Sequence, residues 1–122
     1  MRLRVTLHKA EGLKAADWLG KSDPYCIVEL GDRSAKSSMH RQTLDPDFGD
    51  EAVEVAFDPE QDYAKTFRIR VMDWDPPPKW HDPLGHLDVH LAILRETPEL
   101  FMSEKLVDGE NGKIEFSIRL QE

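Results

Sequence analysis

The sequence lacks the features of a disulfide-stabilised or membrane-spanning protein. It has one cysteine, Cys26, in 122 residues, so no internal disulfide can form and we expect a reducing, cytoplasmic compartment. Cys26 lies in an apolar run, which favours a buried side chain over a reactive thiol. No apolar run approaches the ~20 residues that span a bilayer, and the polar, alternating N-terminal residues do not resemble a signal peptide. We therefore expect a soluble protein with only peripheral membrane contact.

Basic residues are also few. The chain has 16 Lys and Arg against 24 Asp and Glu, a formal net charge of −8. This balance argues against nucleic acid as the main partner, because phosphates require a basic surface, and against unaided adhesion to an anionic membrane. A bound cation would change that balance locally. The length and composition are those of a single globular domain, residues 1–122, whose core is large enough without disulfides or structural metals.

What the sequence does contain is a period of two. Apolar residues alternate with polar ones in six stretches, at residues 3–7, 26–30, 53–57, 67–71, 87–91 and 114–120. We place two further strands near 34–40 and 103–107, a helical turn within 90–101, and a tight turn at 108–112. The pattern predicts an all-β fold, an eight-stranded antiparallel β-sandwich.

Two acid-rich loops, residues 10–25 and 73–82, meet at one end of such a sandwich if the strands pair in simple antiparallel fashion. Carboxylates that converge there repel one another, and a hard divalent cation removes that cost. Calcium fits best because it accepts six to eight oxygen ligands in flexible geometry, whereas magnesium demands a strict octahedron and zinc prefers His or Cys. The acids concerned are Asp17 and Asp23 in the first loop and Asp73, Asp75 and Asp82 in the second.

Two other interpretations of these acids compete with calcium binding. Aspartate is common in turns, which explains any one of the five better than all of them together. Paired carboxylates also serve glycoside hydrolysis, but that chemistry needs a substrate cleft and one acid with a raised pKa. The sequence contains no nucleophile–base pair or phosphate-binding loop, so we do not expect an enzyme.

Several motifs resemble those of the C2 domain, the calcium-dependent phospholipid-binding module. The stretches are "GKSDPY" at residues 20–25, "RQTLDPDFGDE" at 41–51, and "DWDPPPKWHDPLG" at 73–85, and the resemblance covers essentially the whole chain. It implies the phospholipase-type strand order of that family, with Ca²⁺ as the cofactor. The implied metal ligands are the carboxylates of Asp17, Asp23, Asp73, Asp75 and Asp82 and the backbone carbonyls near Ala16 and Trp74.

One departure from the family pattern concerns the second loop. The gap from Asp75 to Asp82 is one residue longer than usual and contains three prolines. His81 is the residue that this longer gap could move into the place of Asp82.

Apolar side chains in the same loops are candidates for contact with lipid. Trp18 and Leu19 lie at the tip of the first loop, Trp80 lies in the second, and Lys79 adds positive charge for an anionic surface. The alternative is that Trp18 and Trp80 fold back on the core. Trp74 lies between two predicted ligands and is expected to pack against the loop base.

A second candidate lipid site lies on one sheet face, where the resemblance suggests phosphoinositide binding by Tyr25, Lys36, Arg68 and Arg70. The alternative is that these are solvated sheet-face residues. As a whole, the sequence predicts a monomeric module that targets a parent protein to phospholipid membranes, anionic or phosphatidylcholine, in signalling or trafficking. A calcium-independent protein–protein interaction module on the same fold is the alternative.

Overall fold

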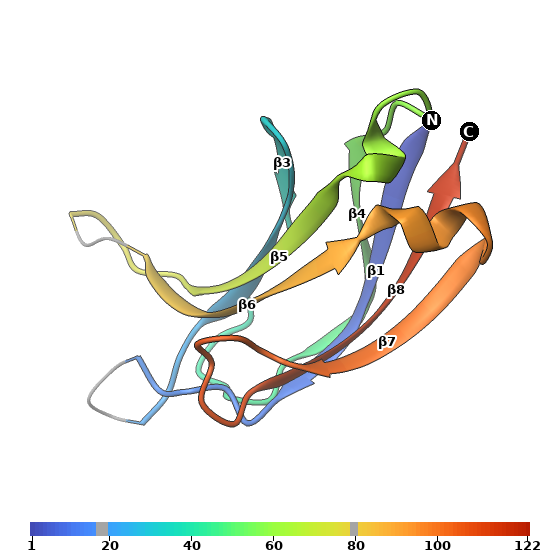
Figure 1. Cartoon of the computed structure of the whole chain (residues 1–122). Helices are drawn as coiled ribbons and strands as arrows, with labels where there is room; N and C mark the ends of the chain where they lie inside the picture. Colours follow the sequence, from blue (N-terminus) through green and yellow to red (C-terminus); the bar gives the residue numbers. More distant parts are fainter. Residues whose placement is uncertain (17–19, 79–80) are drawn as a thin grey trace.

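The computed structural model describes residues 1–16, 20–78 and 81–122 and confirms the predicted sandwich. Within these ranges, all strand pairs are antiparallel and form two sheets, with the strand orders β4-β1-β8-β7 and β3-β2-β5-β6 (Figure 1). The eight strands are β1 (Arg2–Glu11), β2 (Pro24–Leu30), β3 (Arg33–Lys36), β4 (Asp47–Ala56), β5 (Thr66–Asp73), β6 (Asp82–His90), β7 (Glu99–Lys105) and β8 (Lys113–Gln121). None of the helices in the described part of the chain has the length and apolarity to cross a membrane.

The alternating pattern places one face of each central strand in the core. Every second residue is fully buried over residues 3–7 of β1 and 114–118 of β8, as at Val5 and Phe116, and β5 contributes Phe67 in the same way. Burial of side chains of this size stabilises the fold by about 1.5–3 kcal/mol each. Cys26 on β2 is also fully buried, and desolvation raises the pKa of its thiol well above the usual range, so the structure confirms a packing cysteine.

The two weaker strand predictions are confirmed with shifted limits. The strand expected near 34–40 ends at Lys36. Beyond it the chain still runs beside β2, but only isolated hydrogen bonds join the two, such as the one from the Ser37 N–H to the Cys26 carbonyl at 2.9 Å. The strand expected near 103–107 begins earlier, at Glu99. The predicted helical turn is the 3-10 helix η2 (Leu91–Arg95), and the tight turn at 108–112 is closed by a 2.9 Å bond from the Gly112 N–H to the Gly109 carbonyl.

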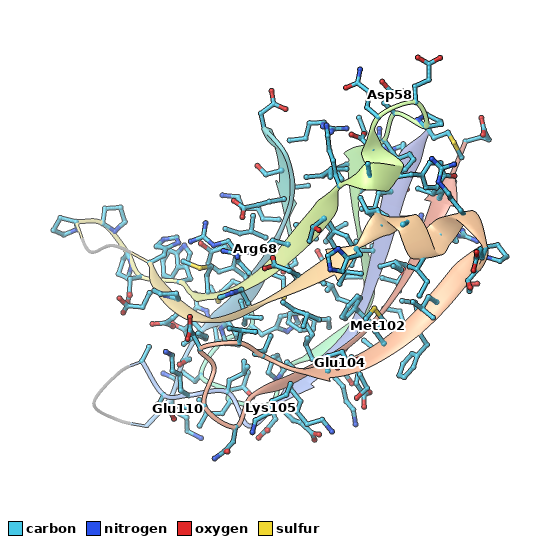
Figure 2. The ribbon with its side chains drawn as sticks, viewed as in Figure 1. Asp58, Arg68, Met102, Glu104, Lys105 and Glu110 are labelled. Carbon is cyan, nitrogen blue, oxygen red and sulfur yellow. The ribbon has the colours of Figure 1, made fainter. Side chains whose placement is uncertain are left out.

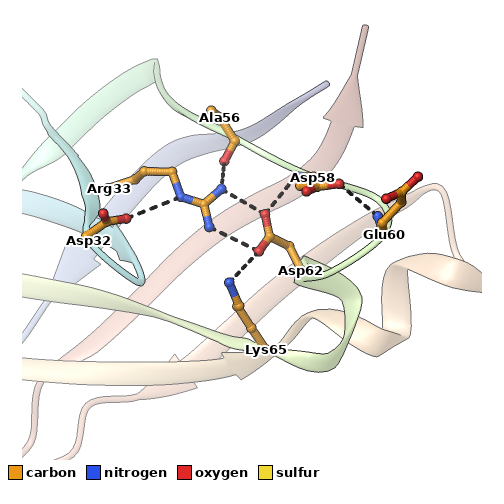
Figure 3. A network of polar contacts seen from close by, with 7 residues as sticks. All are labelled: Asp32, Arg33, Ala56, Asp58, Glu60, Asp62 and Lys65. Carbon is orange, nitrogen blue, oxygen red and sulfur yellow. Dashed lines mark hydrogen bonds and ion pairs between the residues drawn. The ribbon is translucent and has the colours of Figure 1, made fainter.

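A network around one buried carboxylate closes the end of the sandwich that carries both termini (Figures 1 and 3). Asp62, in the 3-10 helix η1 (Asp62–Ala64), has a side chain that is 1% exposed and accepts two bonds from Arg33, at 2.8 and 3.0 Å. Lys65 pairs with it at 2.9 Å, and Arg33 also donates to the Ala56 carbonyl at 2.6 Å. The network therefore joins β3, the end of β4 and η1, and the Arg33 hydrogen bonds hold the pKa of Asp62 far below its ordinary value.

Candidate metal centre

Three of the predicted acids meet where β5 ends and β6 begins, at the opposite end of the sandwich. Asp73, Asp75 and Asp82 each offer a carboxylate oxygen, and these oxygens lie within 4.8 Å of one another. Asp73 and Asp82 are partners in the β5–β6 ladder, and Asp75 follows two residues after Asp73. The long second loop therefore returns with Asp82, and not His81, beside the other two acids.

Backbone contacts attach Asp23 to the same cluster. The Asp23 N–H donates to Oδ1 of Asp73 at 2.7 Å, and the Asp23 carbonyl accepts from the Trp74 N–H at 2.9 Å. Its own carboxylate accepts from the Gln42 N–H at 2.6 Å. These bonds orient two carboxylates of the site from outside, as supporting hydrogen bonds do for metal-ligating acids.

The base of the first loop is fastened by Ser22, which is buried. Its hydroxyl accepts a bond from the Ala16 N–H at 3.0 Å and donates to the Lys14 carbonyl at 3.1 Å. The structure thus ties Ala16, the last described residue before the tip of this loop, to the residue next to Asp23. Asp17, the fifth predicted acid, lies outside the described residues.

The electrostatics of the cluster favour a cation. Asp73 is only 4% exposed, and desolvation is the largest cause that raises its pKa. The charges of Asp75, Asp23 and Asp82 raise the pKa further, whereas the hydrogen bond from the Asp23 backbone opposes the shift. Such a set of hard oxygen donors on a turning chain matches the ligand chemistry of Ca²⁺, and a bound divalent ion would remove the repulsion. The residues present therefore fit calcium.

The predicted lipid-contact residues are described only in part. Trp18, Leu19, Lys79 and Trp80 lie outside the described residues. Trp74 is 37% exposed, and its ring lies 6.1 Å, centroid to centroid, from the imidazole of His81.

The residues of the second candidate lipid site lie on the adjacent strands β3, β2 and β5. Arg68 (labelled in Figure 2) is held by both carboxylate oxygens of Asp88, at 2.8 and 3.0 Å, and Arg70 pairs with Glu29 at 3.5 Å. Lys36 is exposed at the end of β3. Both arginines are thus already paired with carboxylates, which reduces the net positive charge of this sheet face.

Tyr25, the remaining residue of the second candidate lipid site, is buried and contacts the second acidic loop. Its hydroxyl is hydrogen-bonded to Nδ1 of His81 at 2.5 Å, and the two rings meet edge to face at 5.5 Å. Desolvation, as the largest cause, raises the pKa of the phenol. The sequence does not predict this contact, because the two residues are 56 positions apart.

A hydrogen-bonded chain that the sequence does not predict lies on the outer face of the other sheet. His8 contacts Asp50 through Nδ1 at 2.6 Å and the Ser117 hydroxyl through Nε2 at 2.8 Å. This is the order of nucleophile, base and orienting acid in hydrolases, but those enzymes also hold the substrate in a cleft. The described part of the chain contains no pocket beside these three groups.

The chain is thus a β-sandwich that brings carboxylates from two loops together at one end. The family model of the C2 domain matches residues 1–106, and the chain therefore belongs to the C2 domain family. It is 35% identical over 116 residues to Synaptotagmin 1 of Drosophila melanogaster, covering 91% of this chain and 24% of that protein. It is 33% identical over 94 residues to Multiple C2 and transmembrane domain-containing protein 2 of Mus musculus, covering 77% of this chain and 10% of that protein.

Solved structures agree with this family membership. A structure of two C2 domains of Extended-Synaptotagmin 2 matches with a TM-score of 0.80 at 27% identity, over 97% of this chain and 40% of that one. The chain spans well under half the length of these relatives. What it shares with them is therefore one domain of a larger protein.

Proposed function

We propose that this domain binds phospholipid membranes in a calcium-dependent manner and recruits its parent protein to them. The observation that carries the proposal is the cluster of Asp73, Asp75 and Asp82, with Asp23 fastened to it, in a chain of the C2 family. A buried carboxylate whose neighbours are other carboxylates is costly in an isolated fold and is explained by a bound cation. Recruitment would move a cytoplasmic protein to the membrane periphery when calcium rises.

The proposal gives different roles to the acidic residues and to the residues predicted at the loop tips. The carboxylates of Asp23, Asp73, Asp75 and Asp82, with Asp17 and the carbonyls of Ala16 and Trp74, would hold the ion. Bound calcium supplies positive charge and open coordination positions for phosphate oxygens of a lipid headgroup. We assign Trp18, Leu19 and Trp80 to insertion at the membrane interface, where tryptophan is favoured, and Lys79 to the anionic headgroups.

Two finer assignments accompany this proposal. We infer the phospholipase-type order of strands, in which the first strand runs directly into the first acidic loop. We also retain a phosphoinositide site at Tyr25, Lys36, Arg68 and Arg70 as a prediction, in which a headgroup must displace Asp88 and Glu29 from the arginines.

A specific observation favours the alternative function, a calcium-independent protein-interaction module. Phe101 on β7 is 59% exposed and stacks on His8, with ring centroids 5.7 Å apart, on the outer face of its sheet. An exposed aromatic residue of this kind is typical of protein interfaces. This surface lies apart from the acidic cluster and would bind its partner equally well in chelator.

Co-sedimentation with liposomes of phosphatidylcholine and phosphatidylserine separates the two functions. We expect the wild-type domain to bind with calcium and not with chelator, and the variant Asp73→Asn/Asp75→Asn to lose binding at least tenfold. The matched control Asp32→Asn/Glu60→Gln also removes two negative charges, but at exposed positions outside the cluster, and it should bind like the wild type. Calcium-driven binding that survives in the Asp73→Asn/Asp75→Asn variant would refute the proposal.

A further inference from the structure

We propose that Tyr25 and His81 form a clamp that positions Asp82 and thereby sets the calcium affinity of the site. The inference rests on the proposed function and assigns a positioning role to two residues that would not themselves hold the ion. It departs from the sequence-based expectation for both of them. Tyr25 belonged there to a lipid site on the sheet face, and His81 was the residue that could replace Asp82.

The clamp joins the second acidic loop to a rigid strand. Tyr25 is the second residue of β2, is only 6% exposed, and pairs with Met72 of β5 in the ladder. Its hydroxyl meets Nδ1 of His81, and the two rings pack edge to face. His81 is also in contact with Trp74, the residue that follows Asp73 on the other side of the loop. One imidazole thus contacts both the strand and the outgoing part of the loop.

The β5–β6 ladder is irregular at the start of β6. Pro83 pairs with Met72 but has no N–H to donate, and the register of the β5–β6 ladder shifts between Val71 and Met72. Gly85 follows with φ of +136°, a conformation that other residues rarely adopt. The ladder is therefore irregular directly after Asp82, and the Tyr25–His81 contact supplies a second anchor directly before it.

The same strand carries the other side of the site, because Asp23 lies two residues before Tyr25 and its N–H binds Asp73. Through the Tyr25–His81 contact, β2 holds the residue directly before Asp82 as well as Asp23. Metal affinity depends on such preorganisation, since ligands that must first be ordered bind more weakly. Removal of one such hydrogen bond is expected to weaken calcium binding about two- to tenfold, from the usual range of net hydrogen-bond strengths.

The test uses the only two tyrosines of the chain as a matched pair. Tyr25→Phe removes the clamp hydroxyl, and Tyr63→Phe removes a hydroxyl at η1, at the far end of the sandwich. Calorimetric titration with calcium alone should show weaker binding for Tyr25→Phe and unchanged binding for Tyr63→Phe. Amide hydrogen exchange in chelator should be faster at His81 and Asp82 in Tyr25→Phe only, which reports the clamp without any bound ion.

Two further variants distinguish positioning from general stability and guard against misfolding of Tyr25→Phe. His81→Leu should weaken calcium binding as Tyr25→Phe does, and His81→Asn should restore most of the affinity, because its amide can meet the Tyr25 hydroxyl where Nδ1 does. The double variant Tyr25→Phe/His81→Leu should bind no more weakly than His81→Leu. If the wild type binds calcium and every clamp variant matches it, the clamp is refuted alone. If the wild type binds no calcium, the proposed function fails and the clamp with it.

Discussion

Asp75→Asn should make the domain more stable in chelator and less stable than the wild type in calcium. In the structure, the Asp75 carboxylate lies within 4.8 Å of carboxylate oxygens of Asp73 and Asp82. At that separation, two unit charges repel by about 1 kcal/mol when water screens them fully, and by more where the site is partly buried. Loss of the Asp75 charge is therefore expected to raise the free energy of unfolding by about 1 kcal/mol, or Tm by about 4 °C.

The assay is thermal unfolding with and without calcium, for the wild type, Asp75→Asn and the control Asp32→Asn. The Asp32 carboxylate is fully exposed, and its loss should shift the free energy of unfolding by less than ~0.5 kcal/mol. Calcium stabilises whichever form binds it, so the wild type should gain more than Asp75→Asn and overtake it. If Asp75→Asn is less stable than the wild type in chelator, the acids are held by favourable contacts, and the argument from repulsion is wrong.

The pH dependence in chelator follows from Asp73. Its pKa is raised in the folded state, so the folded protein holds its proton more tightly than the unfolded chain does. Stability contributed by this group is therefore greatest at low pH and is lost as pH rises from the ordinary value of 3.8 through the raised folded value. Asp75→Asn removes one cause of the shift and should flatten this part of the stability profile.

Two further predictions concern the body of the domain. Asp62→Asn should lower the free energy of unfolding at pH 7 by about 2–3 kcal/mol, because it leaves Arg33 without its carboxylate, and urea unfolding measures this. Since the pKa of Asp62 is lowered, its contribution is present above pH 3.8 and is lost below it, so the difference from the wild type should shrink toward pH 2, and a constant difference would contradict the pairing. The buried Cys26 thiol should not react with a thiol-specific reagent until denaturant is added, and rapid reaction of the native domain would show that the core opens there.

The sandwich was predictable from the sequence because its signal is local. A period of two is written into each strand, and it assigned Val5 and Phe116 to the core without knowledge of their partners. The proximity of Asp73, Asp75 and Asp82 was predictable for a related reason. The alternating pattern shows where two neighbouring strands end and begin, and these acids lie there.

What the sequence could not predict are contacts between distant side chains whose residue types have many uses. Tyr25 and His81 are separated by 56 positions, and His8 and Ser117 by 109. The role of Gln42 depends on a backbone amide, which no side-chain pattern reports, and on a left-handed conformation with φ of +49°. Such contacts follow from the register of the strands and from loop geometry, and both are set only when the two sheets pack.

The two ends of the sandwich treat a buried carboxylate in opposite ways. At the end with the termini, Asp62 is surrounded by Arg33, Lys65 and backbone donors, which satisfy its charge and lower its pKa (Figure 3). At the other end, Asp73 is almost as deeply buried, but the charges that shift its pKa belong to acids and raise it. The fold can therefore neutralise a buried aspartate within its own chain, and it does so where the role is structural. Among the residues that the structure describes, the charges that shift the pKa of Asp73 are acidic, and this supports our proposal that a bound cation balances them at this end.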